Sequence, residues 1–414
     1  MKTYLVGGAV RDTLLGLPVK DRDWVVVGAT PRELTDQGFI PVGKDFPVFL
    51  HPRSKEQYAL ARTERKTAPG YRGFTIHAAP DVTLEQDLER RDLTINAMAL
   101  DAAALSDNGD FDPTRVDLID PHHGQRDLHD KLLRHVGAAF REDPVRILRV
   151  ARFAARFSDF QVAPETMQLM RAMVAQGEAA ALVAERVWQE LARGLMEDMP
   201  SRMFALLHAC GALTILLPEL NGLWQSLAPG SDRASDPGSM QAHALRALDR
   251  AAQSQAPLPV RFASLFTGSR TPADHRKSPP QNKPVQQLCQ RIRVPIESRE
   301  LAELTSRECT AIHASMALDA QALLLLLERC DAFRKPARFA DLLLVCECDA
   351  RAEVAARDAS YPQRAHMAAV LGAAQGVTTE AVATRALAAG VSGKQVGDLI
   401  HAARVDAVAN ALGA

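Results

Sequence analysis

The sequence lacks the marks of a membrane-spanning or exported protein. Its 414 residues contain no apolar stretch of about 18 residues, the length that a membrane-spanning helix needs. The longest run of leucines, Leu323 to Leu327, is far shorter. The N-terminus reaches Gly7-Gly8 before the apolar core of a signal peptide could form. We therefore expect a cytoplasmic protein without a membrane partner.

Cysteine pairs of the Cys-x-x-Cys type are also missing. Their absence argues against a zinc ribbon and against a redox motif. In a cytoplasmic protein the thiols are expected to be reduced and mostly buried. The six cysteines are Cys210, Cys289, Cys309, Cys330, Cys346 and Cys348.

Net charge is almost absent: the formal value is -1. Global charge therefore gives no support to nucleic-acid binding, and local charge has to carry that case. One short stretch is strongly basic, with only Glu142 and Asp143 opposing its arginines. These are Arg134, Arg141, Arg146, Arg149, Arg152 and Arg156.

The length favours about two to four domains, because one hydrophobic core does not grow to this size. The first third mixes strand-like runs, such as Asp23 to Val27 and Phe46 to Leu50, with Gly and Pro punctuation. From about Asp143 onward Ala, Leu and Arg recur at helical spacing, and no further strand is expected. The fold class expected is α+β: a head with a mixed sheet and helices, followed by an all-α neck, body and tail.

Near the N-terminus, Thr3 to Val6 reads as a strand that runs into Gly7-Gly8-Ala9-Val10-Arg11-Asp12 and the start of a helix. In such a turn backbone N–H groups of Gly8 and its neighbours can approach phosphate oxygens, and Arg11 can add a full positive charge. Alone, a Gly-Gly pair is more often an ordinary tight turn.

Asp21 and Asp23 are the candidate metal ligands. Asp21-Arg22-Asp23 begins the next strand, in which residues i and i+2 project from one face, so we expect the two carboxylates to converge. Paired carboxylates require a neutralising cation, and Mg²⁺ prefers carboxylates together with phosphate oxygens. A pair of Mg²⁺ ions could serve an in-line displacement at an α-phosphorus. Two solvated turn acids remain the alternative, and Glu64 is a candidate third catalytic acid.

Two further segments carry candidate substrate contacts. Arg65 to Thr75 is a glycine-containing basic loop that could close over an RNA end, or an ordinary surface loop. In the run that begins at Glu89, Arg91 could pair with triphosphate oxygens, and Asp92 or Asn96 could recognise ribose hydroxyls.

The basic stretch places Asp143, Arg146, Arg149 and Arg152 at three-residue steps, which on a helix keeps them near one face. An Asp and an Arg held side by side offer an acceptor and donors that could imitate the Watson-Crick edge of a base. Such a pair would select a nucleotide without a nucleic-acid template.

Four motifs, in order and spacing, resemble the bacterial tRNA CCA-adding enzymes of the class II nucleotidyltransferase family, within the polymerase-beta-like superfamily. They are Gly-Gly-Ala-Val-Arg-Asp, Asp-Arg-Asp-Trp, Arg-Arg-Asp-Leu-Thr-Ile-Asn-Ala and Glu-Asp-Pro-Val-Arg-Ile-Leu-Arg-Val-Ala-Arg-Phe. The resemblance is dense over roughly the first 160 residues and thinner beyond them.

The resemblance implies the sequential addition of C, C and A to the 3′ acceptor end of tRNA, from CTP and ATP, with release of pyrophosphate. It assigns Mg²⁺ to Asp21 and Asp23 and the template role to Asp143 and Arg146. No obligate protein partner is evident. The residues that it places around the nucleotide are Gly8, Arg11, Arg91, Asp92, Arg149 and Arg152.

The same resemblance suggests four parts: a catalytic head (1–139), a helical neck (140–222), a degenerate HD-like body (223–332) and a helical tail (333–414). Relatives often carry an HD phosphohydrolase domain, whose His-Asp pair binds a divalent metal. Here Thr267 and Gly268 stand where that pair is expected. We expect no HD activity, and we interpret His243 and His275 as ordinary surface or core histidines rather than metal ligands.

Three alternatives remain. A bacterial poly(A) polymerase shares the head motifs but extends RNA with ATP only. A non-catalytic RNA-binding protein would not require the carboxylate pair. A metal phosphohydrolase centred on residues 225–330 lacks its His-Asp pair.

Overall fold

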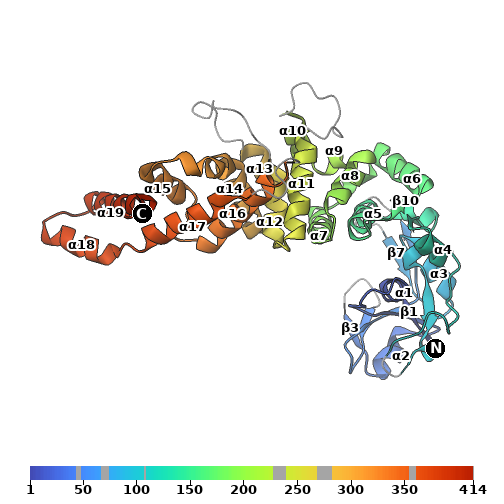
Figure 1. Ribbon diagram of the computed structural model, residues 1–414. Helices are drawn as coiled ribbons and strands as arrows, with labels where there is room; N and C mark the ends of the chain where they lie inside the picture. Colours follow the sequence, from blue (N-terminus) through green and yellow to red (C-terminus); the bar gives the residue numbers. More distant parts are fainter. Residues whose placement is uncertain are drawn as a thin grey trace. The chain divides into compact units, whose positions relative to one another are not determined.

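The computed structural model describes residues 1–42, 48–66, 74–106, 109–226, 239–267, 282–353 and 360–413. The chain forms two compact units (Figure 1). The head unit comprises Met1–Leu191 and Arg202–Leu216, and the body unit comprises Ala192–Ser201 and Leu217–Ala414. No helix among the described residues is long and apolar enough to cross a membrane. The four-part division proposed from the sequence stays a prediction.

The head unit is built on a six-stranded mixed sheet with the order β3-β4-β5-β2-β1-β8. β1 is antiparallel to both of its neighbours, β2 and β8, whereas β2 is parallel to β5. This sheet and the helical elements that follow it confirm the expected fold class. The strands are β1 (Lys2–Val6), β2 (Asp23–Val27), β3 (Ile40–Val42), β4 (Val48–Leu50), β5 (Gln57–Leu60) and β8 (Ala99–Asp101).

Alternation along β2 divides the core between the two faces of this sheet. Val25 joins one hydrophobic cluster, which includes Val6 and Leu88, while its neighbour Val26 joins another with Leu34. Successive side chains of a strand point to opposite faces, so one short apolar strand contributes to both clusters. The register of β2 is therefore well specified.

Local sequence explains where several head helices begin. Thr30 caps α2 and Thr83 caps α3, each with a side chain three residues later that completes a capping box. The head helices are α1 (Gly8–Leu14), α2 (Pro31–Asp36), α3 (Leu84–Glu89), α4 (Gly124–His129), α5 (Val145–Arg156), α6 (Pro164–Ala175), α7 (Ala184–Leu195), α8 (Ser201–Ala209) and α9 (Ala212–Leu216). The 3-10 turns are η1 (Thr94–Asn96), η2 (Ala102–Ala104), η3 (Ala138–Glu142) and η4 (Glu178–Ala181).

Two small strand pairs complete the head unit, β6 (Thr63–Lys66) with β7 (Phe74–His77) and β9 (Leu132–Leu133) with β10 (Gln161–Val162). β10 contradicts the expectation that no strand follows Asp143. It consists of two residues pairing with a strand nearly thirty positions earlier, and so short a segment has no alternation to reveal it. Of the expected run from Phe46 to Leu50, residues 46 and 47 lie outside the described residues.

Replacement of Gly124 by alanine is expected to destabilise the head unit by about 1–3 kcal/mol. Gly124 begins α4, and a Cβ atom there would collide with the carbonyl oxygen of Thr94 and lie 2.9 Å from Cγ of Met98. A backbone oxygen in a hydrogen-bonded turn does not swing aside as a side chain would. Urea denaturation followed by circular dichroism measures the loss.

Gly137→Ala is the matched control for this substitution. A Cβ atom at Gly137 meets nothing within 4 Å, and its φ of -173° is extended backbone that any residue adopts. An equal loss of stability at both positions would contradict the steric explanation.

The body unit is helical throughout its described residues. α16 lies at its centre, packed against α11, α12, α14 and α17, and Figure 1 shows α14 and α16 side by side. The helices are α10 (Pro218–Ser226), α11 (Met240–Gln253), α12 (Leu258–Ala263), α13 (Asn282–Arg291), α14 (Ile296–His313), α15 (Ala320–Arg329), α16 (Pro336–Ala350), α17 (Pro362–Gln375), α18 (Thr379–Ala388) and α19 (Lys394–Gly413). The 3-10 turns are η5 (Ser264–Phe266) and η6 (Ser315–Ala317).

Candidate active site

The glycine turn and Asp23 meet at one end of the paired strands β1 and β2. Val6, the last residue of β1, pairs with Asp23, the first residue of β2. Gly7 and Gly8 follow Val6 directly, so the start of α1 lies beside Asp23. The strand register thus brings Gly8 close to Asp23, although fourteen residues lie between them in the sequence.

Asp21 is not on this strand, because β2 begins at Asp23. The alternation argument for converging side chains is therefore wrong for this pair. Asp21 nevertheless lies close enough for its charge to act on Asp23. Desolvation raises the pKa of Asp23, the charge of Arg91 lowers it and the charge of Asp21 raises it again, with a net upward shift.

The raised pKa of Asp23 comes mainly from its burial, and the nearby charge of Asp21 adds to it. A cation stabilises the charged form of such a carboxylate, and a pair of oxygen donors suits a hard divalent cation. The residues present thus fit a metal of the magnesium type.

Arg91 lies over the glycine turn. Gly7 has a φ of +69°, and a Cβ atom there would lie 2.9 Å from Nη1 of Arg91, so both backbone strain and crowding require glycine. Arg91 donates from Nη1 to the carbonyl oxygen of Asn96 at 3.3 Å and from Nη2 to Asp87 at 3.1 Å. Its buried Nε has no hydrogen-bond partner among the described residues.

Asp87 was not anticipated from the sequence. Its fully buried carboxylate accepts from Arg90 at 2.6 Å as well as from Arg91. Burial raises the pKa of Asp87, but the charges of both arginines hold it below the ordinary value. The spacing of three and four residues on one helical turn was the available signal.

Arg11 is buried and already engaged. Its Nε donates to Asp12 at 2.9 Å, its Nη1 donates to Asn96, and its guanidinium lies 5.2 Å from the ring centres of Phe153 and Phe157. These contacts tie α1 to η1 and to α5. A direct contact of Arg11 with a nucleotide stays a prediction, as does one for Gly8.

Asp92 contacts Asn96, the residue that also accepts from Arg11, and so belongs to the same hydrogen-bond network. Its Oδ1 accepts from Asn96 at 3.1 Å, and its Oδ2 accepts from Nε of Arg149 at 2.6 Å. Burial raises the pKa of Asp92, but the charge of Arg149 and the two hydrogen bonds outweigh it and hold the pKa well below the ordinary range. Asp92 thus fixes Arg149 on α5.

Glu190 on α7 is a second partner missed from the sequence. It accepts from Arg152 at 2.8 Å and lies 4.0 Å from Nη1 of Arg149. Arg152 also lies 4.6 Å from the ring centre of Phe153. The arginines of α5 therefore form one connected row that leads from α1 to α7.

Asp143 does not stand on the helix with the arginines. Its backbone is extended, with φ -122° and ψ 101°, and α5 begins only at Val145. The proline that follows it disfavours the helical region, which explains this error. Both carboxylate oxygens of Asp143 accept from Arg186 on α7, at 2.9 and 2.7 Å.

Arg146 lies on α5 but points its guanidinium at backbone. It donates to the carbonyl oxygen of Ala139 at 2.8 Å and to that of Arg90 at 2.6 Å. The second bond reaches the segment that carries Arg91 and Asp92. Arg146 and Asp143 are thus each held firmly, by different partners.

Glu64 lies in β6, a strand separate from β5, which ends at Leu60. The side chain of Glu64 is outside what the structure describes. Of the basic loop from Arg65 to Thr75, residues 67–73 also lie outside it.

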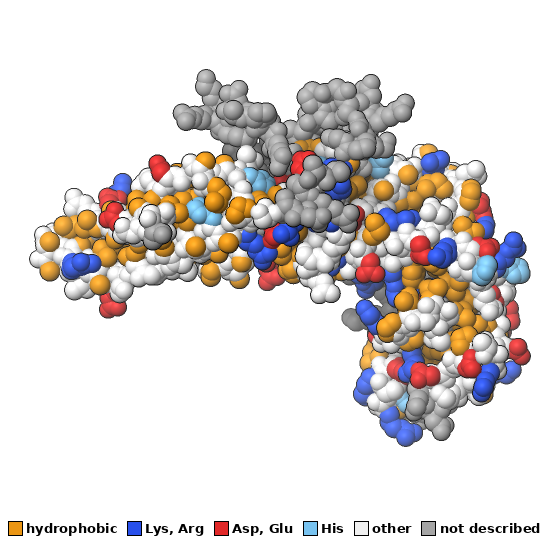
Figure 2. Space-filling model, in the orientation of Figure 1, with side chains coloured by type: hydrophobic (Ala, Val, Ile, Leu, Met, Phe, Trp, Pro, Cys, Tyr) orange, Lys and Arg blue, Asp and Glu red, His pale blue; other side chains and the backbone are white. Residues whose placement is uncertain are grey.

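Charge on the head unit is mixed on the side seen in Figure 2, where basic and acidic side chains are interspersed. Side chains of one charge are therefore not gathered into a single patch on this side of the head unit.

Two family models match the chain. "Poly A polymerase head domain" covers residues 3–134, and "Probable RNA and SrmB- binding site of polymerase A" covers residues 159–223. The chain is 60% identical over 420 residues to a "Multifunctional CCA protein" of Variovorax paradoxus, with 99% of each chain covered. It is 58% identical to a protein of the same name from Polaromonas naphthalenivorans, covering 99% of this chain and 98% of the relative.

Among solved structures, the chain is similar to the "Thermotoga maritima CCA-adding enzyme complexed with tRNA_CCA". The TM-score is 0.61 at 20% identity, with 100% of this chain and 91% of that chain covered. This likeness confirms the fold.

Proposed function

Because the chain belongs to the family of the multifunctional CCA proteins, we propose that it adds C, C and A in turn to the 3′ end of tRNA. It is a CCA tRNA nucleotidyltransferase that takes CTP and ATP and releases pyrophosphate, and its family implies the use of a divalent metal. The observation that carries the proposal is the pairing of Val6 with Asp23, which brings the glycine turn to the aspartates. We place this reaction in the cytoplasm.

Asp21 and Asp23 are the residues that would hold Mg²⁺. When bound, Mg²⁺ supplies positive charge that favours ionisation of the 3′-hydroxyl and stabilises the leaving pyrophosphate. Asp23 is well placed for this role because it pairs with Val6 beside the glycine turn and lies close enough to feel the charge of Asp21. Glu64 stays a candidate third acid.

Arg91 is suited to hold the triphosphate. Its guanidinium lies against Gly7, and its buried Nε still has a hydrogen to donate, as judged from the described residues. Charge-assisted bonds from a guanidinium to phosphate oxygens are strong and directional. Asp87 and the carbonyl of Asn96 would keep Arg91 aimed at that position.

Asp143 and Arg146 would select the base. A carboxylate has about four lone-pair positions, so Asp143 can hold Arg186 and still accept from the amino group shared by cytosine and adenine. Arg186 would then position Asp143, while the two carbonyl bonds position Arg146. Arg149 and Arg152, fixed by Asp92 and Glu190, would complete the pocket.

The test is extension of a tRNA transcript that lacks CCA, with labelled CTP or ATP, with Mg²⁺ present or removed by chelation, and with Asp21→Ala in parallel. We expect two C and then one A, with no addition by the variant or without the metal. Long A tails without C incorporation would instead identify a poly(A) polymerase. Tight tRNA binding with no extension under any condition would identify a non-catalytic RNA-binding protein.

We further expect no release of phosphate from 2′-AMP or 2′,3′-cyclic AMP. Thr267 is buried, and its hydroxyl donates to the carbonyl oxygen of Ser264 at 2.9 Å. This side chain therefore stabilises the turn in which it lies. Gly268 and His275 lie outside the described residues. Metal-dependent phosphate release that survives Asp21→Ala would contradict this expectation.

A further inference from the structure

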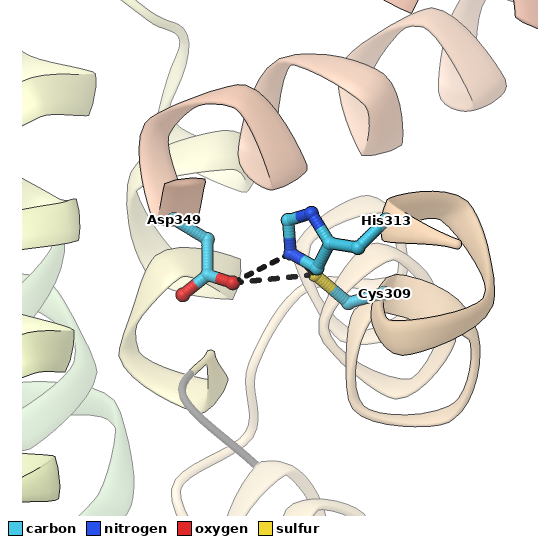
Figure 3. A group of neighbouring side chains, drawn as sticks. All are labelled: Cys309, His313 and Asp349. Atoms are coloured by element: carbon cyan, nitrogen blue, oxygen red, sulfur yellow. Dashed lines mark hydrogen bonds and ion pairs between the residues drawn. The ribbon is translucent and has the colours of Figure 1, made fainter. Parts of the chain in front are cut away.

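A buried group of polar side chains lies in the body unit, apart from the nucleotide chemistry. Cys309 and His313 stand four residues apart on one face of α14, and Asp349 faces them from α16 (Figure 3). Cys309 and Asp349 are buried, and the His313 side chain is 19% exposed. Among the described residues this is the one group of three or more such side chains with ligand atoms all within 4.8 Å of one another.

The spacing of the three ligand atoms is close to that of a tetrahedral zinc site. With bonds of about 2.3 Å to sulfur and about 2.1 Å to nitrogen or oxygen, ligand atoms lie roughly 3.4–3.6 Å apart. Sγ of Cys309 is 3.4 Å from Nε2 of His313 and 3.8 Å from Oδ2 of Asp349. The remaining distance, 2.7 Å from Nε2 to Oδ2, would open by roughly 0.7 Å on metal binding.

Two further side chains orient these ligands. The hydroxyl of Tyr361 lies 2.9 Å from Nδ1 of His313, so Nδ1 can donate to it and leave the lone pair of Nε2 directed at the cluster. His243 on α11 lies with Nε2 2.6 Å from Oδ1 of Asp349, the oxygen that faces away from His313. Metal sites typically have such outer partners, which fix the tautomer of a histidine and the angle of a carboxylate.

His243, interpreted from the sequence as an ordinary surface or core histidine, is buried beside this cluster. It has a carboxylate partner more than a hundred positions away, and that carboxylate also bonds His313. The possible ligands here differ from those of an HD centre. Thr267 stands in place of the histidine of the His-Asp pair and hydrogen-bonds within its own turn, and the cluster includes the thiol of Cys309.

We propose that Cys309, His313 and Asp349 form a binding site for Zn²⁺, with water in the fourth position and with Tyr361 and His243 as orienting partners. A mixed set of sulfur, nitrogen and oxygen ligands favours zinc over the hard cation of the head unit. The bound metal ties α14 to α16, the central helix of the body unit. Binding releases the proton of the Cys309 thiol, as metal thiolates require.

Titration of the chelator-treated full chain with Co²⁺ tests the proposal, since Co²⁺ replaces Zn²⁺ and reports its ligands by absorption. A thiolate ligand gives a sulfur-to-cobalt charge-transfer band, which carboxylates such as Asp21 and Asp23 do not produce. We expect this band to saturate at one Co²⁺ per chain and to disappear on addition of Zn²⁺.

Variants assign the ligands. Cys309→Ser is expected to abolish the band, and His313→Gln to weaken Co²⁺ binding at least tenfold. Cys346→Ser is the matched control, because Cys346 is an equally buried thiol that contacts Cys309, and it should keep the band. Circular dichroism confirms that each variant is folded.

Absence of the band in the unaltered protein would overturn the proposal without any variant. The cluster would then be a metal-free set of hydrogen bonds that shares protons between its histidines and Asp349. Retention of the band in Cys309→Ser would overturn it as well.

Discussion

Replacement of Asp23 by asparagine is expected to lower the rate of nucleotide addition by roughly 10³-fold or more. Asparagine has nearly the shape of aspartate but no negative charge, so it keeps the pairing with Val6 and removes half of the charge that would hold the metal. Single-turnover addition of C to a tRNA transcript measures the rate. Binding of tRNA, followed separately, should change little, because the loss lies in the chemical step.

Asp36→Asn is the matched control for this substitution. Asp36 is an exposed acid at the end of α2, 3.8 Å from Arg32 in a solvent-facing ion pair. Such pairs contribute little, so both activity and stability should be retained. An Asp23→Asn protein that adds C at more than a tenth of the original rate would show that this carboxylate is not a metal ligand.

Asp92→Asn is expected to lower the free energy of unfolding by about 3 kcal/mol, because it leaves Arg149 without its buried counter-charge. Asp92 also accepts from Asn96, which in turn accepts from Arg11, so one change disturbs the link between α1 and α5. Urea denaturation at neutral pH, followed by circular dichroism, measures the loss. The Asp36→Asn control should be within about 0.5 kcal/mol of the original protein.

The pH dependence of stability gives a second readout for Asp92. Its pKa is lowered in the folded protein, so its contribution is fully present above the ordinary carboxyl pKa of about 3.9 and is lost as the pH falls below that value. Stability of the original protein should therefore fall more steeply on acidification than that of Asp92→Asn. Parallel acid limbs for the two proteins would contradict the ion pair with Arg149.

Structural features that depend only on residues close together in the sequence were predictable. The first strand, the glycine turn after Val6 and the apolar strand after Asp23 depend on local alternation and on glycine's access to positive φ. Gly211 follows the end of the helix Ser201–Ala209 with a φ of +82°, a conformation that glycine adopts readily. Each of these signals lies within a few residues of the structure it specifies.

Hydrogen bonds and ion pairs between residues far apart in the sequence were not predictable in the same way. Arg186 and Glu190 read as ordinary charges on a helix, and only the packing of α7 against α5 turns them into partners of Asp143 and Arg152. Asp349 likewise gave no signal, since its histidines lie 36 and 106 positions away. The error at Asp143 has a local cause, because Pro144 disfavours helical backbone at Asp143, so α5 begins at Val145 and not at Asp143.

Chain length is constrained very unevenly around the ends of β1 and β2 that bring the glycine turn to Asp23. The connection at Gly16 to Pro18 is exposed and outside both strands, so residues added there would lengthen a loop and leave the pairing of Val6 with Asp23 intact. One residue added within β1 would turn every later side chain of that strand to the opposite face and carry the glycine turn away from Asp23. Insertions among natural relatives and designed variants should therefore accumulate in that connection and be absent from Lys2–Val6.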